Sequence, residues 1–179
     1  KEYFGHDSFR EGQDRITDSL LGGRDVLGIM PTGAGKSICY QVPALMFDGI
    51  TIVVSPLISL MKDQVSALVQ SGVAAAYINS SLTHAQYLKV LQNTESGKYK
   101  IIYVAPERLC APAFLGICRN LNISMVAVDE AHCVSQWGQN FPPSYLKIPD
   151  FIDALNSRPV VGAFTPTATG AVRDDIKTL

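Results

Sequence analysis

Short apolar runs alternate with longer amphipathic segments along most of this chain. The runs are nearly continuous, and several are rich in β-branched residues, which favours buried strands. They predict strands at Val26–Ile29, Ile50–Val54, Ala74–Ile78, Ile101–Val104, Ile123–Val128 and Val160–Phe164. Apolar residues at helical spacing predict helices at Gln13–Leu21, Ile38–Phe47 (beginning near Lys36), Ile58–Gln70, His84–Gln92 and Thr169–Leu179, with a short one opening at Pro106.

Single positions within two of these helices indicate which side faces a core. Ile16, Leu20 and Leu21 share one side of the first predicted helix. In the His84–Gln92 helix, we expect Leu88 and Leu91 to point inward.

Strands separated by helices predict an α/β fold, with a mostly parallel sheet covered by helices on both faces. In such sheets, ligands bind beyond the carboxyl ends of the strands. We therefore expect the segments that follow the strands to meet at one edge. These segments are Gly33–Ser37, Ser55–Leu57, Ala105–Arg108, Asp129–His132 and Thr165–Thr167.

Composition narrows the class of protein. The chain has 179 residues, of which 47% are hydrophobic and 17% charged, so we expect one globular domain spanning residues 1–179. It has no apolar run of the ~20 residues that span a bilayer and no signal-peptide pattern, so no membrane partner is expected. A net charge of −1 argues against a broadly basic nucleic-acid-coating protein but leaves room for a local binding groove. The 4 cysteines are scattered, which argues against structural zinc and favours a reducing compartment.

The segment Met30–Ser37 has the layout of a phosphate-binding loop, because it ends in Gly-Lys-Ser between a predicted strand and a predicted helix. The general pattern has glycine where Met30 stands, so the loop fits the narrower form of helicase-type ATPases better. Nucleotide contacts are expected from Thr32, Gly33, Ala34, Gly35, Lys36 and Ser37. Lys36 would reach the β- and γ-phosphates of ATP, and the Ser37 hydroxyl would bind Mg²⁺. The alternative is an ordinary glycine-rich turn between a strand and a helix.

Two acids, Asp129 and Glu130, close an otherwise apolar strand. Buried acids are costly unless a cation or a proton transfer needs them. We expect Asp129 to hold Mg²⁺ through its water shell and Glu130 to orient and deprotonate the attacking water. His132 would link the acids to neighbouring loops. The alternative is a strand end that simply meets solvent.

Four segments in this order resemble the superfamily-two helicases: Met30–Ser37, Val54–Gln64, Ala105–Leu109 and the Asp-Glu-Ala-His run at 129–132. The stretch Ala131–Gly138 narrows the resemblance to the RecQ DNA helicases, because it is similar to their aromatic-rich loop. The resemblance implies the first of two RecA-like lobes of an ATP-dependent 3′-to-5′ DNA helicase using ATP and Mg²⁺. Its implied partners are single-stranded or duplex-junction DNA and a second RecA-like lobe of the same full-length chain. In a bacterium, the implied location is the cytoplasm, at the nucleoid. In a eukaryote, it is the nucleus.

The resemblance also assigns residues 1–24 as an adenine-reading segment. Gln13 is suited to hydrogen-bond the adenine edge, and Arg10 to stack on the ring. His6 stands where the family usually has tyrosine, so stacking by that residue is not expected by analogy. Taken alone, Gln13 is equally a polar residue at a helix start.

DNA contacts are implied by the resemblance in several loops. Hydroxyls and loop amides would contact the phosphodiester backbone, and exposed aromatics would stack on bases. The implied residues are Ser55, Pro56, Asn79, Ser80, Glu107, Arg108, Ser135, Gln136, Trp137 and Phe141. The alternatives are routine loops and, for the two aromatics, core packing.

Two prolines depart from the family pattern. Pro142 stands where the family has arginine, and Pro166 where it has alanine in Thr-Ala-Thr-Ala. In related ATPases, the strand before Pro166 lies between the phosphate-loop strand and the acid-bearing strand. Because proline removes an N–H and fixes φ, we hypothesise weakened coupling of ATP hydrolysis to DNA.

The 179 residues contain no match to the family's second lobe, arginine finger, zinc-binding segment or winged helix. We therefore expect these residues alone to bind nucleotide, to hydrolyse it very slowly and not to unwind DNA. Two alternative functions remain open: an RNA helicase or other superfamily-two translocase, and a nucleotide-gated nucleic-acid-binding module.

Overall fold

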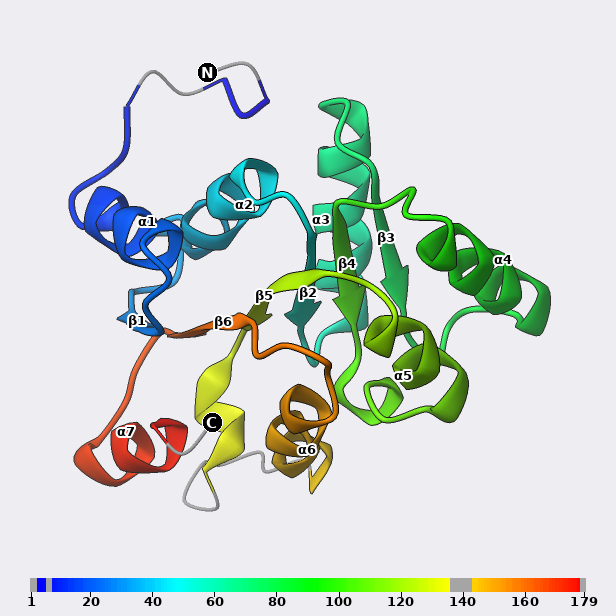
Figure 1. The fold of residues 1–179 in the computed structure, drawn as a ribbon. Helices are drawn as coiled ribbons and strands as arrows, with labels where there is room; N and C mark the ends of the chain where they lie inside the picture. Colours follow the sequence, from blue (N-terminus) through cyan, green and yellow to red (C-terminus); the bar gives the residue numbers. More distant parts are fainter. Residues whose placement is uncertain (1–2, 6–7, 136–142, 178–179) are drawn as a thin grey trace.

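Six parallel strands form one sheet through the middle of the molecule (Figure 1). The structure is a computed structural model, and it describes residues 3–5, 8–135 and 143–177. The strands are β1 (Val26–Ile29), β2 (Ile50–Val54), β3 (Ala75–Ile78), β4 (Ile101–Val104), β5 (Ile123–Val128) and β6 (Val160–Thr165). The predicted strands are thus confirmed, with two boundaries displaced by one residue.

The strand order is β1-β6-β5-β2-β4-β3. Strand β6 therefore lies between the strand that precedes the glycine-rich loop and the strand that ends at the acids, as expected. The register pairs Ile29 with Thr165, and Val54 with both Val104 and Val128, so the carboxyl ends of the central strands are level. The segments that follow these strands meet at one edge of the sheet.

Seven helices and three short 3₁₀ turns complete the described residues. The helices are α1 (Gln13–Leu21), α2 (Lys36–Met46), α3 (Ile58–Gln70), α4 (His84–Glu95), α5 (Pro112–Arg119), α6 (Ile148–Asp153) and α7 (Gly170–Ile176). The 3₁₀ turns are η1 (Pro106–Arg108), η2 (Ala131–Val134) and η3 (Pro143–Lys147). The predicted helices are present, with ends displaced by up to three residues, and the short one at Pro106 is a 3₁₀ turn. Residues 178 and 179 of the last predicted helix lie outside the described residues, and α5 and α6 had not been predicted. Among the described residues, none of these helices is long and apolar enough to cross a membrane.

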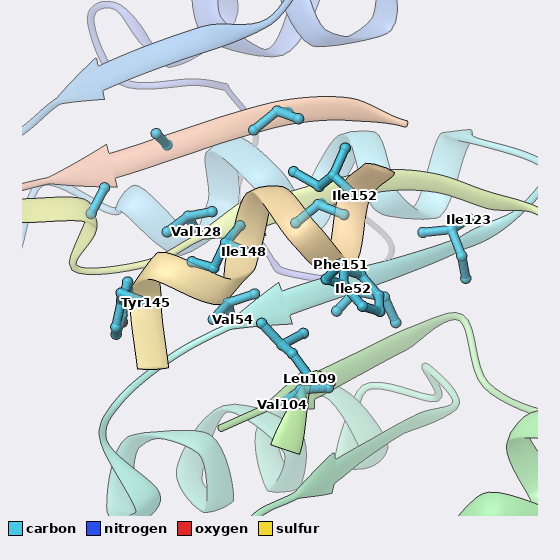
Figure 2. Close-up of a cluster of buried hydrophobic side chains, with 14 of the residues drawn as sticks. Ile52, Val54, Val104, Leu109, Ile123, Val128, Tyr145, Ile148, Phe151 and Ile152 are labelled. Atoms are coloured by element: carbon cyan, nitrogen blue, oxygen red, sulfur yellow. The ribbon is translucent and has the colours of Figure 1, made fainter. Parts of the chain in front are cut away.

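The alternation of side chains along the central strands creates two cores. In β2, Ile52 and Val54 face one side of the sheet and Val53 faces the other. The side of Ile52 is covered by α4, α5, α6 and α7, and Figure 2 shows Phe151 and Ile148 of α6 packed there. The side of Val53 is covered by α1, α2 and α3. The sheet is therefore covered on both faces, as the nearly continuous apolar runs predicted.

The expected inward position of Leu88 is wrong, because 49% of this residue is exposed. Helix α4 packs on the sheet through a stripe containing Tyr87, Leu91 and Thr94. Leu88 follows Tyr87 by one position, which places it about 100° away around the helix. In α1, the residues buried most deeply are Gln13, Thr17 and Leu20, so two polar residues occupy a stripe that was predicted to be apolar.

Candidate nucleotide-binding site

The glycine-rich loop runs from the end of β1 to the first residue of α2. Gly33 and Gly35 have φ values of 82° and 81°, a left-handed conformation that residues with a Cβ rarely adopt. No side chain caps the start of α2, where Gly35 is the N-cap. The free amides of the first helical turn therefore lie where an anion can accept their hydrogen bonds.

The segment before α1 contacts this loop through space. Gln13 Nε2 donates to the carbonyl oxygens of Ala34 and Gly35, at 3.1 and 3.2 Å. Its Oε1 accepts from the Arg10 N–H at 2.8 Å, and Arg10 Nη1 donates to the Gly33 carbonyl at 2.9 Å. The structure thus brings the two predicted nucleotide-binding segments together, and both N–H donors of Gln13 are engaged by the loop.

A cavity of about 480 Å³ opens between the same two segments. It has the size and mixed lining of a small-molecule site. Arg10, Gln13 and Ser37 contribute polar groups, while Phe4, Phe9 and Val42 contribute apolar surface. Phe4 and Phe9 lie within the predicted adenine-reading segment, residues 1–24, whereas Val42 of α2 was not predicted.

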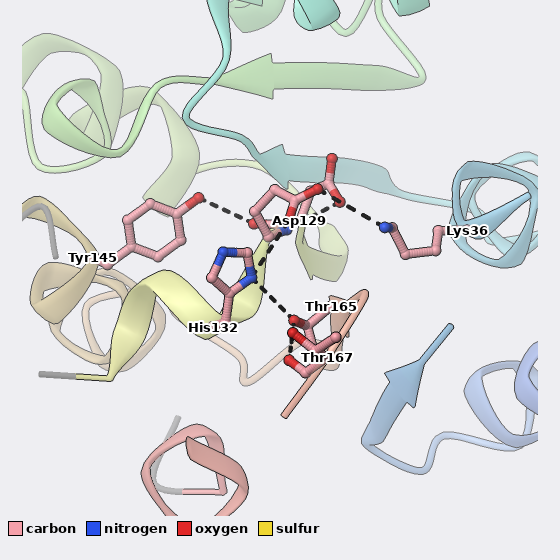
Figure 3. A network of polar contacts seen from close by, with 7 residues as sticks. Lys36, Asp129, His132, Tyr145, Thr165 and Thr167 are labelled. Carbon is pink, nitrogen blue, oxygen red and sulfur yellow. Dashed lines mark hydrogen bonds and ion pairs between the residues drawn. The ribbon is translucent and has the colours of Figure 1, made fainter. Parts of the chain in front are cut away.

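Asp129 lies buried at the end of β5, and only 4% of it is exposed. Its Oδ1 accepts from the Glu130 N–H at 3.0 Å, and its carbonyl oxygen accepts from the Tyr145 hydroxyl at 3.0 Å (Figure 3). Burial raises the pKa of Asp129 to about 6, and the nearby Glu130 charge adds to the increase. The Glu130 N–H and the Lys36 charge oppose it. At neutral pH this carboxylate is negatively charged, although burial disfavours the charge. A bound cation would offset that cost.

Among the described residues, Glu130 is the one non-glycine residue with a positive φ, which is 49°. Its Oε1 lies 3.8 Å from Lys36 Nζ, and its Oε2 lies 3.4 Å from His132 Nδ1. The loop lysine and the acid pair therefore face one another across a shared space. Strained backbone of this kind is common where a side chain must be aimed at a reacting group.

His132 joins the acids to the end of β6. The Thr165 hydroxyl donates to the Thr167 carbonyl at 2.8 Å, across Pro166, and His132 Nδ1 lies 3.0 Å from the same hydroxyl (Figure 3). Since the hydroxyl proton is already used, we assign the proton between these two groups to His132 Nδ1. The same nitrogen lies 3.4 Å from Glu130 Oε2, so the imidazole stands between Thr165 and the acid.

The residues present fit a magnesium ion in the way such ions are usually bound. Among the described residues, no group of three or more His, Cys, Asp or Glu side chains could hold a metal ion by itself. Magnesium commonly takes one or two protein oxygens and completes its shell with phosphates and water. Asp129 and Ser37 offer such oxygens, and a bound cation would offset the cost of burying the Asp129 carboxylate beside Glu130.

The residues predicted to contact DNA fall into two groups. Ser80 and Glu107 are exposed, and Pro56 and Arg108 are half-buried. The other described members, Ser55, Asn79 and Ser135, are buried.

The buried members are poor candidates for direct contact in this conformation. Asn79 Oδ1 accepts from the N–H and hydroxyl of Ser81, and the Ser135 hydroxyl donates to Asp175 of α7 at 2.6 Å. The Ser55 hydroxyl has no hydrogen-bond partner among the described residues. Gln136, Trp137 and Phe141 lie outside the described residues, as do His6 and Pro142.

A second polar cluster lies under the loop helix and was not predicted. Gln41 of α2 donates to the Tyr103 hydroxyl of β4 at 2.9 Å and to Gln64 of α3 at 2.8 Å. The Tyr103 side chain, α2 and α3 lie on the side of the sheet that α1 also covers. No sequence pattern links residues so far apart, so this cluster is visible only in the fold.

These features define a phosphate-loop α/β protein with a RecA-like sheet and an acid pair opposite the loop. The sequence model of DEAD/DEAH box helicases matches residues 10–176, and the chain belongs to this family.

Within the family, the chain resembles RecQ helicases. It is 51% identical over 175 residues to the ATP-dependent DNA helicase RecQ of Bacillus subtilis (strain 168), covering 97% of this chain and 30% of that protein. It is 44% identical over 176 residues to the ATP-dependent DNA helicase RecQ of Haemophilus influenzae, covering 98% and 28%. The chain therefore spans less than a third of the length of these relatives.

Solved helicase structures share the fold. A hypothetical ATP-dependent RNA helicase from Sulfolobus tokodaii matches with a TM-score of 0.76 and 22% identity, covering 97% of this chain and 51% of that chain. The helicase MrfA bound to DNA and AMPPNP matches with a TM-score of 0.77 and 18% identity, covering 97% and 26%. At this identity, the likeness establishes the α/β fold that the sequence predicted.

Proposed function

We propose that this chain is the ATP-binding and ATP-hydrolysing lobe of a DNA helicase that moves 3′ to 5′ along single-stranded DNA. The observation that carries the proposal is the 3.8 Å approach of Lys36 to Glu130, which sets the phosphate-binding loop and the acid pair around one space. The names of the RecQ relatives support DNA as the nucleic acid. The partners proposed are single-stranded or duplex-junction DNA and a second RecA-like lobe of the full-length chain.

Different residues of the chain have different roles in the proposed hydrolysis. The loop amides and the Lys36 ammonium bind the phosphate oxygens of ATP, where negative charge gathers as the terminal phosphoryl group leaves. Asp129 and Ser37 would hold Mg²⁺, which neutralises phosphate charge when bound. Glu130 accepts a proton from the attacking water, whose oxygen bonds to the γ-phosphorus as the bond to the β–γ bridging oxygen breaks. His132 lies beside the Glu130 carboxylate, with its Nδ1 3.4 Å from Oε2, and would help to orient it.

The base of the nucleotide is proposed to bind in the cavity beside Gln13 and Arg10. Its apolar wall suits one face of a purine. Gln13 carries the donor and acceptor that the adenine edge needs, once it releases its present partners in the loop and at Arg10. DNA is proposed to cross the same edge of the sheet, near the exposed Ser80 and Glu107 and near Arg108. The protein is proposed to act where DNA is, at the nucleoid of a bacterium or in the nucleus of a eukaryote.

The test is ATP hydrolysis by the full-length protein, without nucleic acid, with single-stranded DNA and with single-stranded RNA of the same length. We expect DNA to stimulate hydrolysis strongly and RNA weakly. Equal stimulation by RNA would favour an RNA helicase or another translocase. Tight DNA binding that responds to ATP without measurable hydrolysis would favour a nucleotide-gated binding module instead.

A further inference from the structure

The peptide group between Asp129 and Glu130 is held at both ends. Its carbonyl oxygen accepts a hydrogen bond from the Tyr145 hydroxyl at 3.0 Å, and its N–H donates to Asp129 Oδ1 at 3.0 Å. Tyr145 lies in η3, and its ring is fully buried. Figure 3 shows the phenol pointing at the Asp129 backbone from the side opposite Lys36.

The orientation of this peptide matters because the next residue is strained. Glu130 has φ of 49°, in a region that a side chain with a Cβ occupies only when its surroundings hold it there. The φ torsion measures rotation of the residue against the preceding peptide plane. A fixed plane therefore fixes where the Glu130 carboxylate points, which is toward Lys36 and His132.

The Tyr145 hydroxyl is well suited to a permanent donor role. Burial raises its pKa far above the ordinary range, and the nearby Cys133, Asp129 and Glu130 add to the increase. Because a carbonyl oxygen can only accept, the phenol is the donor in its contact with Asp129. The ring belongs to the same buried cluster as Ile148 and Phe151, so its position is set by the fold and not by solvent (Figure 2).

We propose that Tyr145 is a positioning residue for ATP hydrolysis, whose hydroxyl holds the Asp129–Glu130 peptide so that Glu130 is aimed at the attacking water. This inference rests on the proposed function, because it assigns Tyr145 a part in that same reaction. Tyr145 touches neither nucleotide nor water and acts through Glu130.

The experiment compares Tyr145→Phe with Tyr103→Phe in the full-length protein at saturating single-stranded DNA. Both substitutions delete one hydroxyl from a buried tyrosine, but the Tyr103 hydroxyl bonds to Gln41 and not to the acids' backbone. We expect Tyr145→Phe to lower kcat by about 10- to 100-fold, the range for a displaced catalytic group, with KM for ATP unchanged. Tyr103→Phe should leave kcat within about twofold of the parent.

A second comparison separates positioning from a general loss of structure. In a Glu130→Gln background, Tyr145→Phe should cause no further fall in kcat, because the group that it positions has already lost its function. A further fall in that background would overturn the inference, as would a single Tyr145→Phe variant with parental kcat. If the parent protein itself shows no DNA-stimulated hydrolysis, the proposed function fails and the role of Tyr145 fails with it. An active parent with an active Tyr145→Phe variant defeats this inference alone.

Discussion

Lys36 and Glu130 form an ion pair at 3.8 Å although the strands that precede them, β1 and β5, are not neighbours in the sheet. Strand β6 lies between them, so the pair bridges across the end of a third strand. Both side chains are mostly shielded from solvent, which strengthens their attraction. Phosphate oxygens that bind Lys36 would compete with this carboxylate and free it to act on water.

Replacing Lys36 by alanine should abolish catalysis without unfolding the protein. The loss removes the cation that faces both the phosphates and Glu130, and we expect ATP hydrolysis to fall by about 100-fold or more. DNA-stimulated hydrolysis and nucleotide-independent DNA binding are measured together. A motor loses hydrolysis and every ATP-dependent change, whereas a passive binding module keeps its DNA affinity. The second pattern would contradict the proposed function.

The buried Asp129 should make the free protein less stable as pH rises. Its folded pKa of about 6 exceeds the ordinary aspartate value of 3.8, so the folded state binds the proton more tightly. Stability is therefore lost as pH rises from about 4 to about 6, by at most about 3 kcal/mol above that window. Asp129→Asn keeps an oxygen for the Glu130 N–H and should raise Tm at pH 7 but not at pH 4, in the absence of nucleotide and Mg²⁺.

Asp25 provides a control of opposite sign for that experiment. Burial acts to raise its pKa, but hydrogen bonds from Arg158 and from the Val161 N–H lower the pKa overall. Its contribution to stability is present above its unfolded pKa and is lost on acidification. Asp25→Asn should therefore lower Tm at pH 7 and have a diminishing effect toward low pH. The same direction of change for both variants would show that the Asp129 effect is not electrostatic.

Gln13→Ala should weaken ATP binding and its discrimination from GTP. The substitution removes the carboxamide proposed to contact adenine and also two hydrogen bonds to the loop carbonyls. Loss of one net hydrogen bond corresponds to about a tenfold rise in KM for ATP. The ratio of kcat/KM values for ATP and GTP is the decisive measurement. An unchanged ratio with raised KM values would mean that Gln13 supports the loop and does not read the base.

Pro166→Ala should raise the stimulation of ATP hydrolysis by DNA several-fold. The substitution restores a backbone N–H at position 166. At present the Thr165 hydroxyl bonds across the proline to the Thr167 carbonyl, and the same hydroxyl contacts His132. The measurement is the ratio of kcat with and without single-stranded DNA in the full-length protein. Pro142→Arg, in the predicted aromatic loop, is compared in parallel. If neither substitution changes the ratio, the idea of weakened coupling is wrong.

Local sequence patterns predicted the sheet because buried parallel strands must be continuously apolar. The same patterns failed where a short helix offers too few turns to show a period, as in α5 and α6. They also failed at Leu88, because a helix of mixed composition does not reveal which of two adjacent residues faces the core.

The candidate site was predicted as far as it lies in contiguous motifs. The lysine, the serine and the acid pair follow strands directly, so the rule for parallel sheets places them at one edge. Tyr145 was missed because its partner is a backbone carbonyl that leaves no mark on the sequence. The burial of Asn79 and Ser135 was missed for a related reason, since their bonds to Ser81 and Asp175 depend on tertiary packing.

The hydrogen bonds that Gln13 and Arg10 donate to the loop carbonyls have a thermodynamic consequence. Any molecule that draws the Gln13 carboxamide toward itself must release two carbonyl groups and so alter the shape of the anion cradle. Adenosine and pyrophosphate, offered separately, should then influence one another's affinity, and the sum of their separate binding free energies should not equal that of the intact nucleotide.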